Sequence, residues 1–178
     1  MFKLIAFVTF CAVVIQADPV PFKCGEYPWA ILKCIGAPKV IKKEIADQCN
    51  SDPSECENNK CVYRKLGWMN EEEVIDQSKV AAYFDEVAKE YPLWADAVAV
   101  VKAECLVNNL PNLGTERNCL PYDTTQCAMA RFIKSAKPSQ WKTDAECEIP
   151  RQFVANCPIC PKGCVAPFPE GLCNQCKV

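Results

Sequence analysis

The stretch Cys56-Glu-Asn-Asn-Lys-Cys61-Val-Tyr-Arg-Lys-Leu-Gly-Trp-Met-Asn70 carries two cysteines at a spacing that one helix can accommodate. The turn-forming cluster Ser51-Asp52-Pro53 precedes it, so we predict a helix that begins after this cluster and runs toward Leu66. Successive residues of a helix are rotated by about 100°, so the two cysteine side chains are expected to point about 140° apart.

Apolar residues that follow this stretch recur at helical spacing. Asn70, followed three residues later by Glu73, predicts an N-cap with a capping-box partner at the start of a helix. Pro92 marks the boundary between that helix and the next one. Two helices joined this tightly are expected to share a core or a pocket. The apolar stripe of the first helix is Val80, Phe84, Val87 and Tyr91, and that of the second is Trp94, Val98, Val101 and Cys105.

Further helices are predicted on both sides of this central pair. Upstream, Pro38 is placed in the first turn of a helix over residues 38–49. Downstream, Pro121 starts a helix that Pro138 ends, and a last helix is expected between Asp144 and Cys157. Residues 158–178 combine prolines, glycines and cysteines and are predicted to be an irregular, disulfide-stapled tail. No alternation typical of strands appears, so the predicted fold class is all-α.

The first residues have the pattern of a secretory signal peptide. Lys3 supplies the positive charge, residues 4–15 are mostly apolar, and Ala17 is the small residue before a cleavage site. A membrane anchor is the alternative, but an anchor needs about 20 apolar residues and this run stops at Gln16. We therefore predict that residues 1–17 are removed and that the mature protein is secreted and extracellular, without insertion into a membrane.

Export also determines how the cysteines are interpreted. The sequence has 15 cysteines and no histidine, and one of the cysteines, Cys11, is lost with the signal peptide. The even number that remains favours complete pairing into disulfides in an oxidising compartment, although the pairing itself stays open. The cysteines predicted to be bridged are Cys24, Cys34, Cys49, Cys56, Cys61, Cys105, Cys119, Cys127, Cys147, Cys157, Cys160, Cys164, Cys173 and Cys176.

The composition argues against catalysis and against nucleic-acid binding. A net charge of −2 provides no concentrated basic face for nucleic acid. Without histidine, a serine or cysteine nucleophile has no imidazole base, and a zinc hydrolase lacks its commonest ligand. A glycosidase that uses two carboxylates stays formally possible, but no such pair stands out. We expect no enzymatic activity, no catalytic residue and no cofactor.

Two CxxC pairs lie at residues 157–160 and 173–176. In a cytosolic protein their four thiolates could surround a zinc ion. Thiols of a secreted chain tend to oxidise before they can hold zinc, so we interpret these cysteines as structural and predict no metal site.

The central stretch, the acidic helix start after it and the later Cys105 resemble the insect odorant-binding proteins. In that family a cysteine pair on one helix is followed by a Lys-Leu-Gly-like turn and then by a further cysteine. The segment Cys127-Ala-Met-Ala-Arg-Phe-Ile-Lys-Ser-Ala-Lys-Pro-Ser-Gln-Trp141, with Glu146-Cys147 and residues 151–157, resembles the longer, cysteine-enriched subgroup called Plus-C. The resemblance covers most of residues 24–157.

This resemblance implies a bundle of about six helices around an apolar cavity, formed by residues 18–157 with the tail 158–178 packed on the same domain. It implies a carrier of a small hydrophobic ligand, such as an odorant, pheromone or fatty acid, with a membrane receptor as a further candidate partner. It also implies the family's bridges, from Cys61 to Cys34 or Cys24, from Cys56 to a cysteine in the region 119–127, and from Cys105 to a later cysteine.

Large apolar residues on the helix stripes are the candidates for lining such a cavity, although core packing is the plainer interpretation of each one. Tyr83 and Tyr91 could also hydrogen-bond a ligand hydroxyl or carbonyl. Since histidine is absent, binding is predicted to change little between about pH 6 and pH 8. The candidates are Trp68, Tyr83, Phe84, Tyr91, Trp94, Val98, Met129, Phe132 and Ile133.

A different class of function also fits the sequence. A secreted, disulfide-rich interaction protein, such as a protease inhibitor or a venom or salivary effector, would use the bridged tail as a rigid binding surface. Deletion of residues 158–178 distinguishes the two functions, because only the interaction protein would lose its activity.

Overall fold

The computed structural model describes residues 30–108, 110, 119–157 and 159. The predicted signal peptide and, apart from Ile159, the predicted C-terminal tail lie outside these residues. Within them no helix is long and apolar enough to cross a membrane. The described residues contain seven α-helices and three short 3-10 helices, with only isolated β-bridges, so the predicted all-α class is confirmed. The α-helices are α1 (Ile31–Cys34), α2 (Lys43–Asp47), α3 (Glu55–Lys65), α4 (Gln77–Glu90), α5 (Ala95–Cys105), α6 (Leu120–Lys134) and α7 (Glu148–Asn156); the 3-10 helices are η1 (Pro92–Trp94), η2 (Pro138–Gln140) and η3 (Ala145–Cys147).

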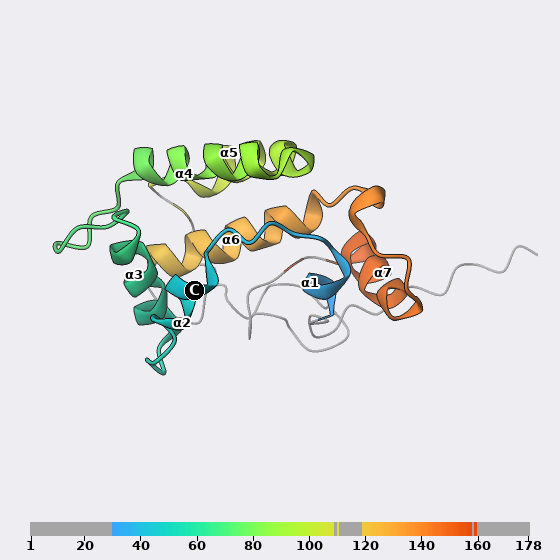
Figure 1. Ribbon diagram of the computed structural model, residues 1–178, viewed down its shortest axis with the longest axis horizontal. Coiled ribbons are helices and arrows are strands. Elements are labelled where there is room, and N and C mark those ends of the chain that lie inside the picture. Colours follow the sequence, from blue (N-terminus) through green and yellow to red (C-terminus); the bar gives the residue numbers. More distant parts are fainter. Residues whose placement is uncertain (1–29, 109, 111–118, 158, 160–178) are drawn as a thin grey trace, which may run out of the picture.

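Helix α6 is the central element of the molecule (Figure 1). The α4–α5 hairpin lies along one side of α6, α3 and α2 lie at one end of it, and α1 and α7 lie at the other end. The residues that α6 buries include Tyr122, Cys127, Phe132 and Ile133. Because several neighbours contact α6, the helix contributes buried residues to the core along most of its length.

Several predicted helix boundaries are confirmed. Helix α3 begins where the Ser51-Asp52-Pro53 cluster ends, with the Ser54 side chain accepting a hydrogen bond from the Glu57 backbone N–H at 3.3 Å. Helices α4 and α5 are separated at Pro92, α6 begins with a proline in its first turn, and its last residue, Lys134, precedes Pro138. These boundaries could be predicted because caps and prolines act through the local backbone.

Two predicted helices begin later than expected. Helix α4 starts at Gln77, where the Asp76 side chain accepts the backbone N–H groups of Ser78 and Lys79, both at 3.1 Å. Asn70 instead closes a turn, since its side-chain oxygen accepts the Val74 N–H at 2.8 Å. Glu73 adopts a positive φ of 61°, which places it in that turn and outside any helix.

The helix predicted over residues 38–49 is also wrong for most of its length. Only α2 is helical there, and the chain before it, residues 35–42, is an extended segment that we call the strap. In Figure 1 the strap runs along α6 from α1 to α2. Two of its backbone carbonyls, those of Gly36 and Val40, accept hydrogen bonds from side chains of other elements, as described below.

Four disulfide bridges join the described elements, and Cys157 is also disulfide-bonded. The bridges Cys56–Cys119 and Cys105–Cys127 agree with the pairing that the resemblance implied. The predicted partner of Cys61 is wrong, because Cys61 pairs with Cys49 and Cys34 pairs with Cys147. Cys24, Cys160, Cys164, Cys173 and Cys176 lie outside the described residues.

Geometry explains this difference in pairing. Cys56 and Cys61 point to different sides of α3, so one reaches the start of α6 and the other reaches the chain that leaves α2. Cys34 belongs to α1, which lies at the opposite end of α6 and packs against α7 (Figure 1). It is therefore far from α3 and bonds to Cys147 instead.

Candidate functional site

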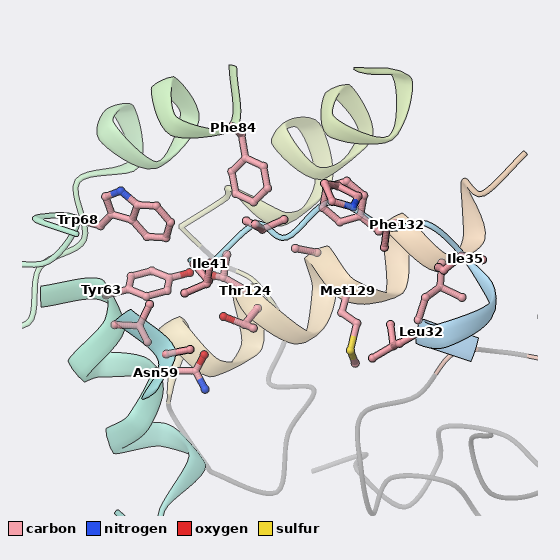
Figure 2. A pocket seen from close by; sticks show the side chains of 18 residues that line it. Leu32, Ile35, Ile41, Asn59, Tyr63, Trp68, Phe84, Thr124, Met129 and Phe132 are labelled. Carbon is pink, nitrogen blue, oxygen red and sulfur yellow. The ribbon is translucent and has the colours of Figure 1, made fainter. Parts of the chain in front are cut away.

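A cavity of about 310 Å³ lies between α6, α3, the strap and Phe84 in the middle of α4 (Figure 2). Most of its lining is aliphatic or aromatic, and none of the described residues that line it is charged. Those residues are Leu32, Ile35, Ala37, Pro38, Val40, Ile41, Ala46, Asn59, Val62, Tyr63, Trp68, Phe84, Thr124, Thr125, Ala128, Met129, Phe132 and Ile133.

The end of α3 positions two aromatic residues of the cavity, Tyr63 and Trp68. The helix closes with a Schellman motif, in which the Trp68 N–H donates to the Tyr63 carbonyl at 2.9 Å and the Gly67 N–H donates to the Arg64 carbonyl at 3.0 Å. Gly67 has a φ of 68°, a left-handed conformation that glycine adopts without steric cost. The Tyr63 and Trp68 rings then meet edge to face with centroids 5.1 Å apart.

The strap forms another wall of the cavity, and two aromatic side chains hold it in place. The Trp94 indole N–H donates to the Gly36 carbonyl at 2.9 Å, and the Tyr83 hydroxyl donates to the Val40 carbonyl at 2.8 Å. The Gly36 N–H also donates to the Gln140 carbonyl at 3.3 Å. These bonds pair backbone groups that no helix pairs, and they let Val40 and Ile41 face the cavity.

Helix α6 contributes a continuous stripe to the cavity. Its lining residues occur in adjacent pairs four residues apart, which is the repeat of one helix face. Phe132 anchors this face, since its ring stacks on Phe84 with centroids 6.4 Å apart and meets Trp94 edge to face at 5.8 Å. The stripe thus connects the cavity to the core beneath the α4–α5 hairpin. Its residues are Thr124, Thr125, Ala128, Met129, Phe132 and Ile133.

The titratable group of the cavity stays neutral at physiological pH. Burial raises the pKa of the Tyr63 hydroxyl to about 12, and the hydroxyls of Thr125 and Thr124, which would stabilise a phenolate, offset part of this rise. Tyr63 therefore keeps its proton and can both donate and accept a hydrogen bond. No described lining residue changes charge between about pH 6 and pH 8.

Five of the nine candidates from the sequence line this cavity: Trp68, Phe84, Met129, Phe132 and Ile133. That any of them contacts a ligand remains a prediction. The other four candidates do not line it. Tyr83 and Trp94 donate hydrogen bonds to backbone carbonyls of the strap. The Tyr83 ring also packs edge to face on Trp68, with ring centroids 4.9 Å apart.

The last two candidates lie elsewhere on the α4–α5 hairpin. Val98 borders a second hollow of about 440 Å³ that includes the charged Asp85 and Lys102. Tyr91 ends α4 next to Glu90, whose carboxylate raises the pKa of the Tyr91 hydroxyl. Both residues belong to the predicted stripes, but the stripes extend beyond the cavity because helices also pack against one another.

The sequence prediction missed the residues that the strap and α3 contribute. A signal for part of α3 was present, because Asn59, Val62 and Tyr63 are spaced as one helix face beside Cys61. The strap residues Val40 and Ile41 lie within the helix that was predicted over residues 38–49. Thr124 and Thr125 carried no local signal, since a threonine in a helix is usually a surface residue.

One cluster of potential metal ligands is present among the described residues. The side chains of Asp144, Glu146 and Cys147 place one ligand atom each within 4.8 Å of one another. The sulfur of Cys147 is bonded to Cys34, so it cannot act as a thiolate ligand. Two exposed carboxylates remain, and they do not define a metal site by themselves.

Comparison with known proteins adds one relative to these observations. The chain is 22% identical over 145 residues to general odorant-binding protein 68 of Anopheles gambiae, a match that covers 70% of this chain and 68% of the relative. No protein-family model matches the chain, and no solved structure matches it. The assignment to the Plus-C subgroup therefore stays a prediction. Together with the all-helical, disulfide-bridged fold, this relative confirms the resemblance of the chain to the insect odorant-binding protein family.

Proposed function

We propose that this protein is a secreted carrier that binds a small hydrophobic ligand in the cavity between α3, α6 and the strap. The observation that carries the proposal is an uncharged, mostly apolar cavity of about 310 Å³. Ligand sites typically have a volume of about 300–1,000 Å³ and a lining that is apolar apart from a few polar groups. The relative named as an odorant-binding protein supports the same class of function.

The disulfides support this proposal energetically. An internal cavity costs stability, on the order of 24 cal/mol per Å³ in a well-packed core. Each bridge offsets such a cost by restricting the unfolded chain, typically by about 2–4 kcal/mol. The bridge from α3 to the residue before α6, the bridge from α5 to α6 and the bridge from α3 to the chain after α2 can therefore fix these helices around a space that a ligand would fill.

The experiment is a titration of the oxidised, secreted protein with an environment-sensitive apolar fluorophore, followed by displacement with alcohols, aldehydes, esters and fatty acids. Ala128→Leu adds three carbons inside the cavity and is expected to weaken fluorophore binding about 5-fold to 150-fold, the equivalent of about 1–3 kcal/mol of overpacking. The matched control is Ala82→Leu, the same change at an exposed position of α4, which should bind like the wild type.

Binding should also be measured between pH 6 and pH 8, where it is expected to vary little. A folded, oxidised wild-type protein that takes up no fluorophore would contradict the carrier function and favour a secreted interaction protein. Equal binding by Ala128→Leu and the wild type would show that the fluorophore binds elsewhere.

A further inference from the structure

The two ends of the cavity differ in chemistry. Asn59, Tyr63 and Thr124 gather at the end where α3 meets α6, whereas Leu32, Ile35 and Met129 lie at the end near α1 (Figure 2). The first group carries an amide and two hydroxyls, and the second group carries only aliphatic carbon and a thioether. A ligand that fills the cavity would therefore meet polar atoms at one end only.

Thr124 is the most informative residue of the polar end. The residue is 3% exposed, and its hydroxyl oxygen has no hydrogen-bond partner among the described residues. Its neighbour Thr125 is satisfied within the helix, because its hydroxyl donates to the Pro121 carbonyl at 2.9 Å. A buried hydroxyl without a partner is unfavourable unless something else, such as a bound molecule, supplies the partner.

Tyr63 and Asn59 extend the polar end on the side of α3. The Tyr63 hydroxyl lies close enough to the two threonine hydroxyls for them to influence its pKa. The Asn59 side-chain nitrogen donates to the Glu55 carbonyl at 2.7 Å, which fixes the orientation of the amide at the cavity wall. Two neutral hydroxyls and an amide can hydrogen-bond an oxygen atom, but they carry no net charge.

The absence of charge decides which oxygen-bearing group fits. A carboxylate moved from water into this cavity would lose its hydration and meet no cation among the described lining residues. A neutral oxygen loses far less and can be compensated by one or two hydrogen bonds. The polar end therefore matches an alcohol, aldehyde or ketone better than an ionised fatty acid.

We infer that the ligand is a neutral amphiphile whose oxygen-bearing end is hydrogen-bonded by Thr124 and Tyr63 and whose apolar chain extends toward Leu32 and Met129. This inference rests on the proposed carrier function and specifies the chemical class and orientation of its ligand. Thr124 is the residue that determines this preference, since its buried hydroxyl lies beside that of Tyr63 and makes none of the hydrogen bonds found among the described residues, so a ligand oxygen can take that place.

The experiment compares four compounds of equal chain length, octan-1-ol, octanal, octanoate and octane, by displacement of the apolar fluorophore at pH 7.5. Thr124→Val removes the hydroxyl at nearly constant volume, and Thr143→Val is the matched control at an exposed position. The expected result is about a fivefold loss of octanol and octanal affinity in Thr124→Val, the effect of one hydrogen bond, with unchanged octane affinity. Octanoate is expected to bind the wild type at least about tenfold more weakly than octanol.

Other outcomes would overturn the inference. Octanoate binding as tightly as octanol, or an equal loss of octane and octanol affinity in Thr124→Val, would overturn it while leaving the carrier function intact. Failure of the fluorophore and of all four compounds to bind the wild type would overturn the carrier function and this inference with it. Tyr63→Phe provides a second variant, with the same selective loss expected, should Thr124→Val fold poorly.

Discussion

Loss of the Cys56–Cys119 bridge is expected to destabilise the protein more than loss of the Cys49–Cys61 bridge, although both are anchored on α3. The two bridges span 63 and 12 residues of chain. Each has one buried cysteine and one half-buried cysteine, so replacing both members by alanine removes similar packing in the two cases. The chain-entropy model then gives about 4.3 kcal/mol for the longer loop and about 2.8 kcal/mol for the shorter, a difference of about 1.5 kcal/mol.

Urea unfolding of the wild type, Cys56→Ala/Cys119→Ala and Cys49→Ala/Cys61→Ala measures this difference. Peptide mapping of each variant should first show that the other bridges have kept their partners. As a control, the three proteins should become similar in stability when all bridges are reduced. Equal losses, or a larger loss for the short loop, would refute the reasoning, because unfolded-chain entropy would then not set the order.

Two further predictions concern the strap and the start of α4. Tyr83→Phe removes the hydrogen bond to the Val40 carbonyl. The free energy of unfolding should fall by about 1 kcal/mol, and fluorophore binding should weaken. An unchanged free energy of unfolding together with unchanged fluorophore affinity would show that the strap does not depend on this bond. The Ser78 hydroxyl and the Lys79 N–H donate hydrogen bonds to the Asp76 carboxylate and so lower the pKa of Asp76 in the folded protein. The ionised Asp76 therefore stabilises the folded protein fully above the unfolded-state pKa of about 4. This stabilisation is lost as the pH falls through the lower pKa of the folded state. The free energy of unfolding should therefore fall on acidification from pH 7 to pH 3, less steeply in Asp76→Asn, which can still cap the helix; parallel curves would contradict this prediction.

Local signals explain which elements could be predicted. Helix α3 and its Schellman end follow from a serine cap, a helical cysteine pair and Gly67, all within one short stretch. The start of α4 shows the limit of such signals, because Asn70 and Asp76 are both good caps. The Asp76 N–H donates to the Trp68 carbonyl at 2.7 Å, so residues 68–76 form a closed loop after α3. Helix α4 begins only after this loop, and Asp76 is therefore the residue that caps it.

Non-local contacts explain what could not be predicted. The strap has the apolar spacing of a helix, but its Val40 and Gly36 carbonyls accept hydrogen bonds from Tyr83 and Trp94, which are 43 and 58 positions away from these acceptors. Five of the nine candidate site residues line the cavity, since large apolar side chains on helix stripes are buried on one side or another. The sequence did not predict the polar end of the cavity, because the burial of Thr124 and the lack of a hydrogen-bond partner for its hydroxyl among the described residues are visible only in the structure.

The sequence by itself determined the helical class, several helix boundaries, and that the cysteines of the described residues would be bridged. These features depend on periodicity, caps and prolines, which act over a few residues. Only the tertiary structure decided that Cys61 pairs with Cys49, that residues 35–42 form an extended wall, and that an uncharged cavity has one polar end. Those outcomes depend on which segments, distant in the sequence, pack together around α6, and local sequence patterns do not predict such long-range contacts.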